Sequence, residues 1–309
     1  MIKVRLFRIY DLTFFLDKKS KIICLINRVR YTGCQLSLIN CLLDYFGLTS
    51  LEISAVCYTS PAEYYWGGLA SLERRGTTSW INWLIASEKA DNLNLPLLLD
   101  FLVTAAGNEQ MKYLAAVVDE NQWFCSSFRL NGFSIYSRQC VWHLCASSIP
   151  TDEHWTSELI EPFNECDLFL QAQIPPLIRQ IGNNWSNNQV YILRKNNQII
   201  LCAKIELFKK QVYIEPVFHP EAENPGNLLV QLASWVCQSP EIEIRVAIPG
   251  FQAWLTESLL SEGFQIEMKQ IIYVKNLAVK VTDEVMSFAF DQKKLQPIGP
   301  HQYHAIEKK

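Results

Sequence analysis

One short segment combines the residue types that bind zinc. Cys140, His143 and Cys145 all lie within CVWHLC, and cysteine and histidine at short spacings are the usual zinc ligands. The segment is an apolar run of the kind that forms a β-strand, in which successive side chains alternate between two faces. Cys140 would then face away from both His143 and Cys145, whereas a structural zinc site needs four converging ligands. We therefore predict core thiols and no metal site.

Other patterns that could carry chemistry lack the context that their chemistry needs. The sequence has no Cys-His or Ser-His-Asp arrangement in the setting of a known hydrolase. Nine tryptophans, including Trp66, Trp80, Trp83 and Trp142, could stack on bases. However, 28 basic residues against 31 acidic ones give a net charge of −3, which leaves no basic surplus to neutralise phosphates. We interpret the tryptophans as core anchors or as a seam between two halves, and predict no nucleic-acid partner.

The cysteines and the apolar runs bear on the compartment in which the protein works. Ten cysteines are scattered without a C-x-x-C pair, and a chain of 309 residues does not depend on a disulfide scaffold. No apolar stretch approaches the roughly 20 residues of a membrane span. Charged residues also interrupt the N-terminal apolar runs, unlike a signal peptide. We predict free buried thiols, a cytoplasmic location and no membrane contact.

The chain contains an internal repeat, which should decide its domain organisation. An offset of 131 residues, which places Gly132 on Gly263, aligns residues 113–144 with 244–275 without a gap. The alignment predicts two copies of one domain, residues 1–148 and 149–281, followed by a C-terminal tail at 282–309. Other identical pairs at this offset include Trp123 with Trp254, Phe133 with Phe264, and Gln139 with Gln270.

Both copies predict the same order of strands and helices. Apolar β-branched runs indicate strands, and helical spacing of apolar residues indicates helices that Gly132 and Gly263 end as left-handed caps. This order indicates an α/β fold with a mixed sheet and helices on its faces. The expected strands are 4–9, 79–87, 113–118 and 133–144 in the first copy, and 190–195, 199–207, 212–218, 244–248 and 264–274 in the second. The expected helices are 39–46, 95–106, 227–237 and 168–181, the last divided by Pro175-Pro176; Asn196-Asn197 is a hairpin turn, and 60–68 is a loop.

The order of a hairpin, a strand, a helix, a strand, a helix ending in Gly-Phe and a final strand resembles that of the GNAT N-acetyltransferase superfamily. The resemblance is carried by the helix ends NGF (131–133) and EGF (262–264) after the strands YLAAVV and IEIRVAI, and it covers most of the chain. It implies two tandem GNAT-like acyl-CoA N-acyltransferase folds. It also implies that acetyl-CoA, as co-substrate, binds between two splayed strands and that its acetyl group passes to an amine.

The loop that holds the cofactor in this superfamily is degenerate in both copies. The family pattern of Gln or Arg, two residues, Gly, one residue, and Gly or Ala is replaced by EKADNLNL in the first copy and HPEAENPGN in the second. The second copy keeps Gly226, with Asn224 and Asn227 as helix caps at a helix start that would attract a diphosphate. The resemblance therefore assigns cofactor binding to the second copy, at Val217, Phe218, His219, Asn224, Gly226, Asn227 and Gln252.

The family's usual proton donor to the departing thiolate is also missing. Its tyrosine falls at Phe128 in the first copy and at Leu259 in the second, and neither side chain can donate a proton. Tyr213 or Tyr273 could serve by another geometry. A mechanism of this kind also needs a general base for the attacking amine.

Two carboxylates are candidates for that base. Glu215 lies in the strand next to the expected cofactor cleft, and Glu206 lies on the neighbouring hairpin strand, although carboxylates on strands more often face solvent. Two functions follow from these observations. The first is an N-acetyltransferase that acts on an amine of an unidentified small-molecule or peptide acceptor. The alternative is a catalytically inactive GNAT-fold binding or regulatory module; a monomer or a homodimer fits either function.

Overall fold

The fold was analysed in a computed structural model, which describes residues 3–6, 22–25, 27–32, 52–58, 66–75, 77–86, 94–147, 155–159, 164–181 and 189–277. The expected helix at 39–46 and the expected tail at 282–309 lie outside these residues. The strands are β1 (Lys3–Leu6), β2 (Ile22–Cys24), β3 (Glu52–Tyr58), β4 (Trp66–Arg75), β5 (Thr78–Ala86), β6 (Tyr113–Asp119), β7 (Ser134–Ser147), β8 (Trp155–Leu159), β9 (Gln189–Lys195), β10 (Gln198–Phe208), β11 (Gln211–Phe218), β12 (Glu241–Pro249) and β13 (Gln265–Asn276). The helices are α2 (Asn27–Thr32), α4 (Asn94–Asn108), α5 (Cys125–Leu130), α6 (Glu165–Gln173), α7 (Pro176–Ile181), α8 (Pro225–Cys237), the 3₁₀ helix η3 (Gly250–Leu255) and α9 (Thr256–Ser261).

The predicted repeat is present in the structure. The series β5, α4, β6, α5, β7 in the first copy matches β11, α8, β12, α9, β13 in the second, and α4 and α8 begin 131 residues apart. Gly132 and Gly263 have φ of 76° and 86°, which confirms that left-handed glycines end the short helices. The hairpin turn at Asn196-Asn197, where both residues have positive φ, is also confirmed.

One detail near the N-terminus differs from expectation. The loop expected at 60–68 is wrong at its end, because Trp66 already begins β4, which pairs with both β3 and β5. Strand β1 is described only as far as Leu6. By contrast, the proline pair Pro175-Pro176 separates α6 from α7 as predicted, since proline lacks the N–H that a continuous helix would need.

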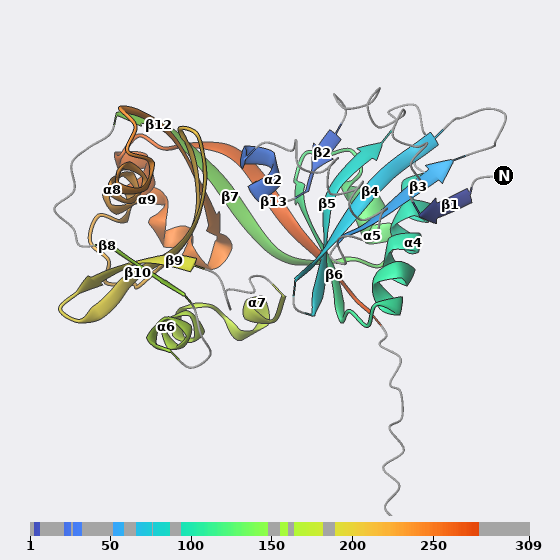
Figure 1. The fold of residues 1–309 in the computed structure, drawn as a ribbon, viewed down its shortest axis with the longest axis horizontal. Helices are drawn as coiled ribbons and strands as arrows, with labels where there is room; N and C mark the ends of the chain where they lie inside the picture. The colour runs from blue at the N-terminus through green and yellow to red at the C-terminus, as the bar shows by residue number, and fades with distance from the viewer. Residues whose placement is uncertain are drawn as a thin grey trace, which may run out of the picture. The chain divides into compact units, whose positions relative to one another are not determined.

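The last strands of the two copies are exchanged within a single mixed sheet. The sheet order is β1-β3-β4-β5-β6-β13-β7-β12-β11-β10-β9-β8, with β2 paired to β5. Strand β13 therefore lies between β6 and β7, and β7 lies between β13 and β12; Figure 1 shows β7 and β13 running together. Gln139 and Gln270, which the repeat aligns, face each other in the β7–β13 pairing, so a pseudo-two-fold axis passes between them. The boundaries at 148 and 281 stay a prediction.

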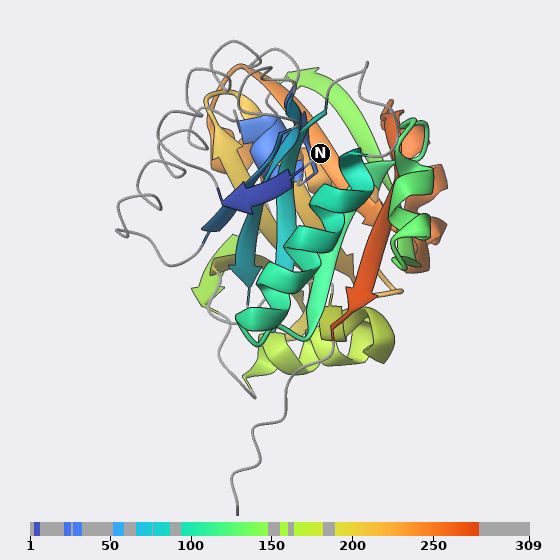
Figure 2. The ribbon, with the colours of Figure 1, turned by 90° about the vertical axis from the view of Figure 1, so that its right-hand side faces the viewer.

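Each hydrophobic core includes side chains from the other copy. In the first core, Leu99 and Leu102 of α4, which lies across the sheet in Figure 2, pack in one cluster with Ile271 and Tyr273 of the exchanged β13. In the second core, Trp142 of β7 packs with residues of α8, β11 and β12. Trp80, Trp83 and Trp142 are all buried, which confirms their role as core anchors.

Two further findings concern the described residues only. None of their helices is long and apolar enough to cross a bilayer. The cysteines whose side chains are described are free, and burial raises the pKa of the Cys166 thiol to about 12, so this thiol is protonated and unreactive at neutral pH.

Candidate functional site

Two parallel strands separate in the same way in each copy. In the first copy β5 and β6 pair only from 78–80 to 113–115, and in the second β11 and β12 pair only from 211–214 to 243–246. Beyond these residues the two strands of each pair no longer bond to each other. We call the resulting spaces the first wedge, between β5 and β6, and the second wedge, between β11 and β12.

The first wedge is filled by the chain's own backbone. Strand β2 pairs antiparallel with the free part of β5, so that Cys24 lies opposite Trp83. The next residue, Leu25, donates its N–H to the carbonyl of Asn82 (2.8 Å) and accepts a hydrogen bond from Val117 N–H of β6 (3.1 Å). Leu25 itself is buried. Because one segment bonds to both strands, the first wedge does not fit an acyl-CoA.

The second wedge is bridged by one side chain, Gln252 of η3. Its Nε2 donates to the carbonyl of Pro216 (2.9 Å), and its Oε1 accepts from Phe218 N–H (2.9 Å). These two backbone groups lie on β11 beyond its pairing with β12, so the side-chain amide satisfies polar groups that the splay would leave buried and unpaired. Gln252 is 2% exposed. In this structure the amide of Gln252 therefore occupies the second wedge.

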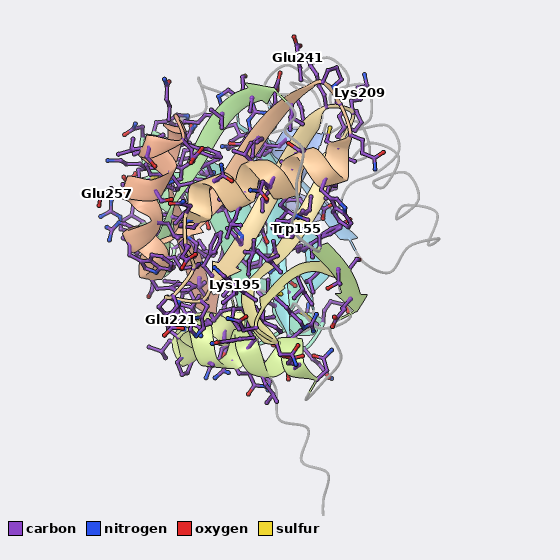
Figure 3. The ribbon with its side chains drawn as sticks, turned by 90° about the vertical axis from the view of Figure 1, so that its left-hand side faces the viewer. Trp155, Lys195, Lys209, Glu221, Glu241 and Glu257 are labelled. Carbon is purple, nitrogen blue, oxygen red and sulfur yellow. The ribbon has the colours of Figure 1, made fainter. Side chains whose placement is uncertain are left out.

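The start of α8, where a diphosphate was expected, offers few free donors. Pro225 has no N–H, and Gly226 N–H donates to Ser258 Oγ (3.0 Å). Asn224 has φ of 46°, and its side chain forms no capping hydrogen bond. Glu221 precedes the helix and appears with Lys195 in Figure 3, which views the face that α8 crosses. These residues do not fit a tightly held diphosphate.

The other expected cofactor residues have partners within the protein. The His219 ring is 3.0 Å from Gln198 Nε2 and accepts from Glu221 N–H (3.2 Å). Asn227 Oδ1 accepts from Gln231 Nε2 (2.6 Å). Val217 and Phe218 are buried, in separate apolar clusters. The structure brings these residues to one end of the second wedge, and their cofactor role stays a prediction.

Gly226 has a packing role that predicts a clear stability effect. A Cβ at this position would lie 2.5 Å from the backbone oxygen of Ser258, because α8 and α9 approach closely there. We expect Gly226→Ala to lower the free energy of unfolding by about 1–3 kcal/mol, the usual cost of overpacking. Urea denaturation would measure it. Gly107→Ala in α4 is the matched control, since its Cβ would meet nothing within 4 Å; a Gly226 variant as stable as this control would contradict the prediction.

A cavity open to solvent, of about 580 Å³, lies at the second wedge. Its wall includes Glu215 of β11, Phe251 of η3, Arg179 of α7, and Ser137 and Gln139 of the exchanged strand β7. Glu206 lies opposite Tyr213 on β10 and is not among the lining residues. Of the two candidate bases, the structure places only Glu215 on the cavity wall.

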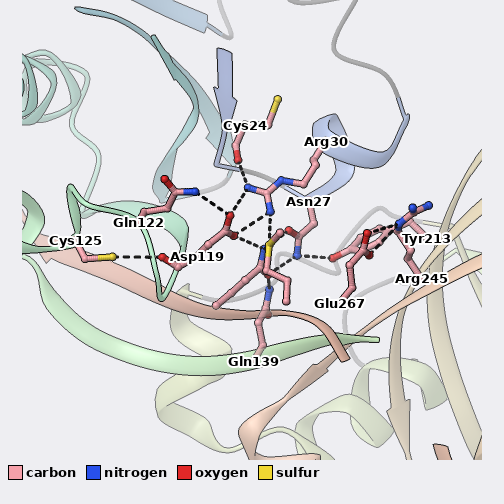
Figure 4. A network of polar contacts seen from close by, with 12 residues as sticks. Cys24, Asn27, Arg30, Asp119, Gln122, Cys125, Gln139, Tyr213, Arg245 and Glu267 are labelled. Atoms are coloured by element: carbon pink, nitrogen blue, oxygen red, sulfur yellow. Dashed lines mark hydrogen bonds and ion pairs between the residues drawn. The ribbon is translucent and has the colours of Figure 1, made fainter. Parts of the chain in front are cut away.

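A buried polar network connects Glu215 with the pseudo-two-fold axis, and Figure 4 shows the part of it around Tyr213, Asn27 and Gln139. Tyr213 donates its phenol proton to Glu215 Oε1 (3.1 Å) and accepts from Asn27 Nδ2 (3.0 Å). The Asn27 amide also exchanges two hydrogen bonds with Gln270 (2.7 and 2.9 Å), whose Oε1 accepts from Gln139 Nε2 (2.8 Å). Tyr213 is thus fixed beside Glu215 by residues of the other copy.

Helix α2 covers the face of β11 that carries Tyr213. The Tyr31 ring stacks on the Tyr213 ring with centroids 5.5 Å apart. Arg30 anchors the same helix through two hydrogen bonds to Asp119 (2.9 and 3.1 Å) and one to the carbonyl of Cys24 (2.8 Å). The segment that fills the first wedge therefore continues into the helix that covers Tyr213. Apart from the polar residues of NRVRY, no pattern in the sequence predicts this arrangement.

The buried, stacked rings of Tyr31 and Tyr213 should make the free energy of unfolding decrease at alkaline pH. Burial, together with the charge of Glu267, raises the pKa of Tyr31 to about 12, and burial raises that of Tyr213 well above 10. Below pH 10 both phenols are neutral whether folded or unfolded; above it only the unfolded chain ionises, so stability falls as pH rises. We expect Tyr31→Phe to make this fall shallower by about 1.4 kcal/mol per pH unit between roughly pH 10 and 12. Urea denaturation at several pH values in this range would measure the free energy of unfolding of both proteins. If the prediction is wrong, this free energy falls with pH at the same slope in the wild-type protein and in Tyr31→Phe.

No protein-family model matches the sequence, and no curated protein sequence matches it either. Solved structures do share the fold. A tandem GNAT protein from the clavulanic acid biosynthesis pathway superposes with a TM-score of 0.52 at 10% identity, covering 89% of this chain and 98% of that one. A Pyrococcus horikoshii protein described as a candidate acetyltransferase gives 0.51 at 10% identity, covering 90% of each chain. At such identity the likeness shows the fold alone, and it confirms the predicted tandem GNAT-like α/β fold.

Proposed function

We propose that the protein is an N-acyltransferase whose single active site is the cavity at the second wedge. The observation that carries the proposal is the position of Glu215, a carboxylate on the wall of a cavity that opens to solvent where two parallel strands of a GNAT-like fold separate. The first copy is then architectural, because β2 occupies its wedge. The free thiols are in keeping with the cytoplasmic location predicted from the sequence.

Gln252 supports binding of an acyl-pantetheine arm in the second wedge. Such an arm carries amide groups, and an amide in the place of the Gln252 side chain would form the same two hydrogen bonds with β11. The displaced Gln252 amide must then reach water, because a buried amide without partners would cost about 1–3 kcal/mol. An acyl-CoA would supply the activated acyl group of a thioester.

The chain's own residues supply the proton chemistry. Glu215 takes a proton from the acceptor's ammonium, which leaves the neutral amine as nucleophile. The new C–N bond forms as the C–S bond of the thioester breaks, and the second proton that the nitrogen loses passes through water to the departing thiolate. The Tyr213 hydrogen bond holds the carboxylate in place, which makes Tyr213 a positioning residue in this arrangement.

Isothermal titration and a thiol-release assay would test the proposal together. We expect acetyl-CoA to bind, and acetyl-pantetheine to bind with similar affinity, because the start of α8 offers the diphosphate few donors. Free thiol should accumulate only when an amine acceptor is present. Absence of binding by acetyl-CoA, longer acyl-CoA and acetyl-pantetheine alike would overturn the proposal.

The start of α8 favours a second candidate function, a binding module that has lost acyl transfer. Gly226 N–H is already bonded and Pro225 has no N–H, which is the arrangement expected if no diphosphate is bound. This candidate predicts that the cavity binds an amine while no acyl donor releases thiol. Acyl transfer that depends on Glu215 would exclude it.

A further inference from the structure

The cavity at the second wedge is lined by one acidic and one basic side chain, and neither has an ionic partner within the part of the chain that the structure describes. Glu215 accepts a hydrogen bond from the neutral phenol of Tyr213. Arg179 donates from Nη1 to the backbone carbonyl of Gln171 (3.2 Å). Among the residues that the structure describes, neither forms an ion pair with another side chain, although both line the same cavity.

Several charged side chains elsewhere on this protein do have ionic partners. Arg194 pairs with Glu158 (2.7 Å) and Glu165 (3.1 Å), and Arg245 pairs with Glu267 (3.0 Å). Two opposite charges that share a concave site without meeting each other are arranged to meet charges of opposite sign on a ligand. Arginine suits a carboxylate in particular, because its planar fork of donors can bind both oxygens.

The other residues that line the cavity indicate which kind of group would lie between the two charged ends of a ligand. Ile174, Ile178 and Phe251 belong to the lining, and they come from the segment around α7 and from η3. These side chains would pack against an apolar group and exclude water from it. The Gln139 amide adds a neutral hydrogen-bonding group on the opposite, exchanged strand.

From these contacts we propose that the cavity binds a small zwitterion with an amine, a carboxylate and an apolar side chain, of which an apolar amino acid is the simplest case. Glu215 binds the ammonium group, Arg179 binds the carboxylate, and the apolar side chain lies against Ile178 and Phe251. As the acceptor for acyl transfer this deepens the proposed function and rests on it, but binding of the zwitterion does not require that transfer takes place.

A ligand series on the wild-type protein tests the inference without any substitution. L-phenylalanine, phenethylamine and 3-phenylpropionate share one ring, and the last two lack the carboxylate and the amine respectively. We expect L-phenylalanine to bind about 10- to 100-fold more tightly than either by isothermal titration, the size of one lost charge-assisted hydrogen bond. Equal affinities, or no binding by any of the three and by L-leucine, would overturn the inference.

Two variants of Arg179 test whether this residue binds the carboxylate of the ligand. Arg179→Gln should weaken the binding of L-phenylalanine by the same factor. The affinity for phenethylamine should not change, and this unchanged affinity would also show that the variant is folded. Arg179→Lys should recover part of the loss, since it keeps the charge without the fork. Arg138→Gln on β7 is the matched control, because Arg138 pairs with Glu120 and does not line the cavity. If Arg179→Gln lost affinity equally for L-phenylalanine and phenethylamine, the assignment of Arg179 to the carboxylate would be contradicted.

The outcomes also separate this inference from the proposed function. If thiol release with phenethylamine had the same KM as with L-phenylalanine, the proposed acyltransferase function would be supported and the inferred zwitterion specificity would be refuted. If L-phenylalanine bound in a way that depends on Arg179 but no acyl donor released thiol, the zwitterion site would be supported and the acyltransferase function would be refuted.

Discussion

Replacing Glu215 by glutamine is expected to lower kcat/KM for acyl transfer by about 10²- to 10⁴-fold, the usual contribution of a general base. Glutamine has nearly the same shape and can still accept the hydrogen bond from Tyr213, so the fold should not change. The variant cannot take a proton from the acceptor's ammonium. The thiol-release assay with saturating acyl donor would measure the loss.

The pH dependence separates a base from a merely structural carboxylate. As the pH rises toward the pKa of the amine acceptor, a growing share of that acceptor is neutral in solution and needs no base. The deficit of Glu215→Gln should therefore narrow with rising pH. Glu206→Gln is the matched control, because Glu206 lies on the next strand and does not line the cavity. A Glu206 variant that loses as much activity, or a Glu215 deficit that is constant with pH, would refute this role.

Production of residues 1–148 and 149–309 as separate chains is expected to give insoluble protein from each, and one soluble heterodimer when they are produced together. Alone, the first chain lacks β13, which pairs along β6 and supplies Ile271 and Tyr273 to the first core. The second lacks β7, which pairs along β12 and supplies Trp142 to the second core. Each would expose unpaired strand edges and apolar surface, which favour aggregation.

Differently tagged chains and size-exclusion chromatography would measure this outcome. As a control, a protease site between residues 148 and 149 of the intact chain should allow cleavage without dissociation, since the exchanged strands keep the halves together. A soluble, monomeric 1–148 would contradict the prediction, because β7 would then have folded back onto β6 in place of β13.

The sequence predicted the repeated elements, from β5 to β7 and from β11 to β13, because their signals are local, whereas β2, α2, β3, β4 and β8 were not predicted. Gly132, Gly263 and Asn196-Asn197 marked turns that need positive φ. The pairing of the last strands was not predictable in this way. The apolar pattern of β7 is satisfied equally beside β6 or beside β12, so the choice depends on tertiary contacts alone.

The candidate site was predicted in part. The structure places Glu215 on the cavity wall and Gln252 in the wedge, although the glutamine's reach across to β11 could not be read from its position in the chain. Arg179 was missed, and the one available signal was a lone cation in the apolar segment IPPLIRQI. The filling of the first wedge by β2 was also missed, because a run as short as IIC does not specify its partner strand.

The exchange of the last strands also sets an order of events on the ribosome. The edge of β6 is complete at Asp119, but the strand that covers it begins only at Gln265, 146 residues later. At about 5–20 residues per second, translation leaves that edge exposed for roughly 7 to 30 s. The nascent first half must wait in an unfinished state for this time, and holding chaperones or slow codons that alter the delay should change the yield of folded protein.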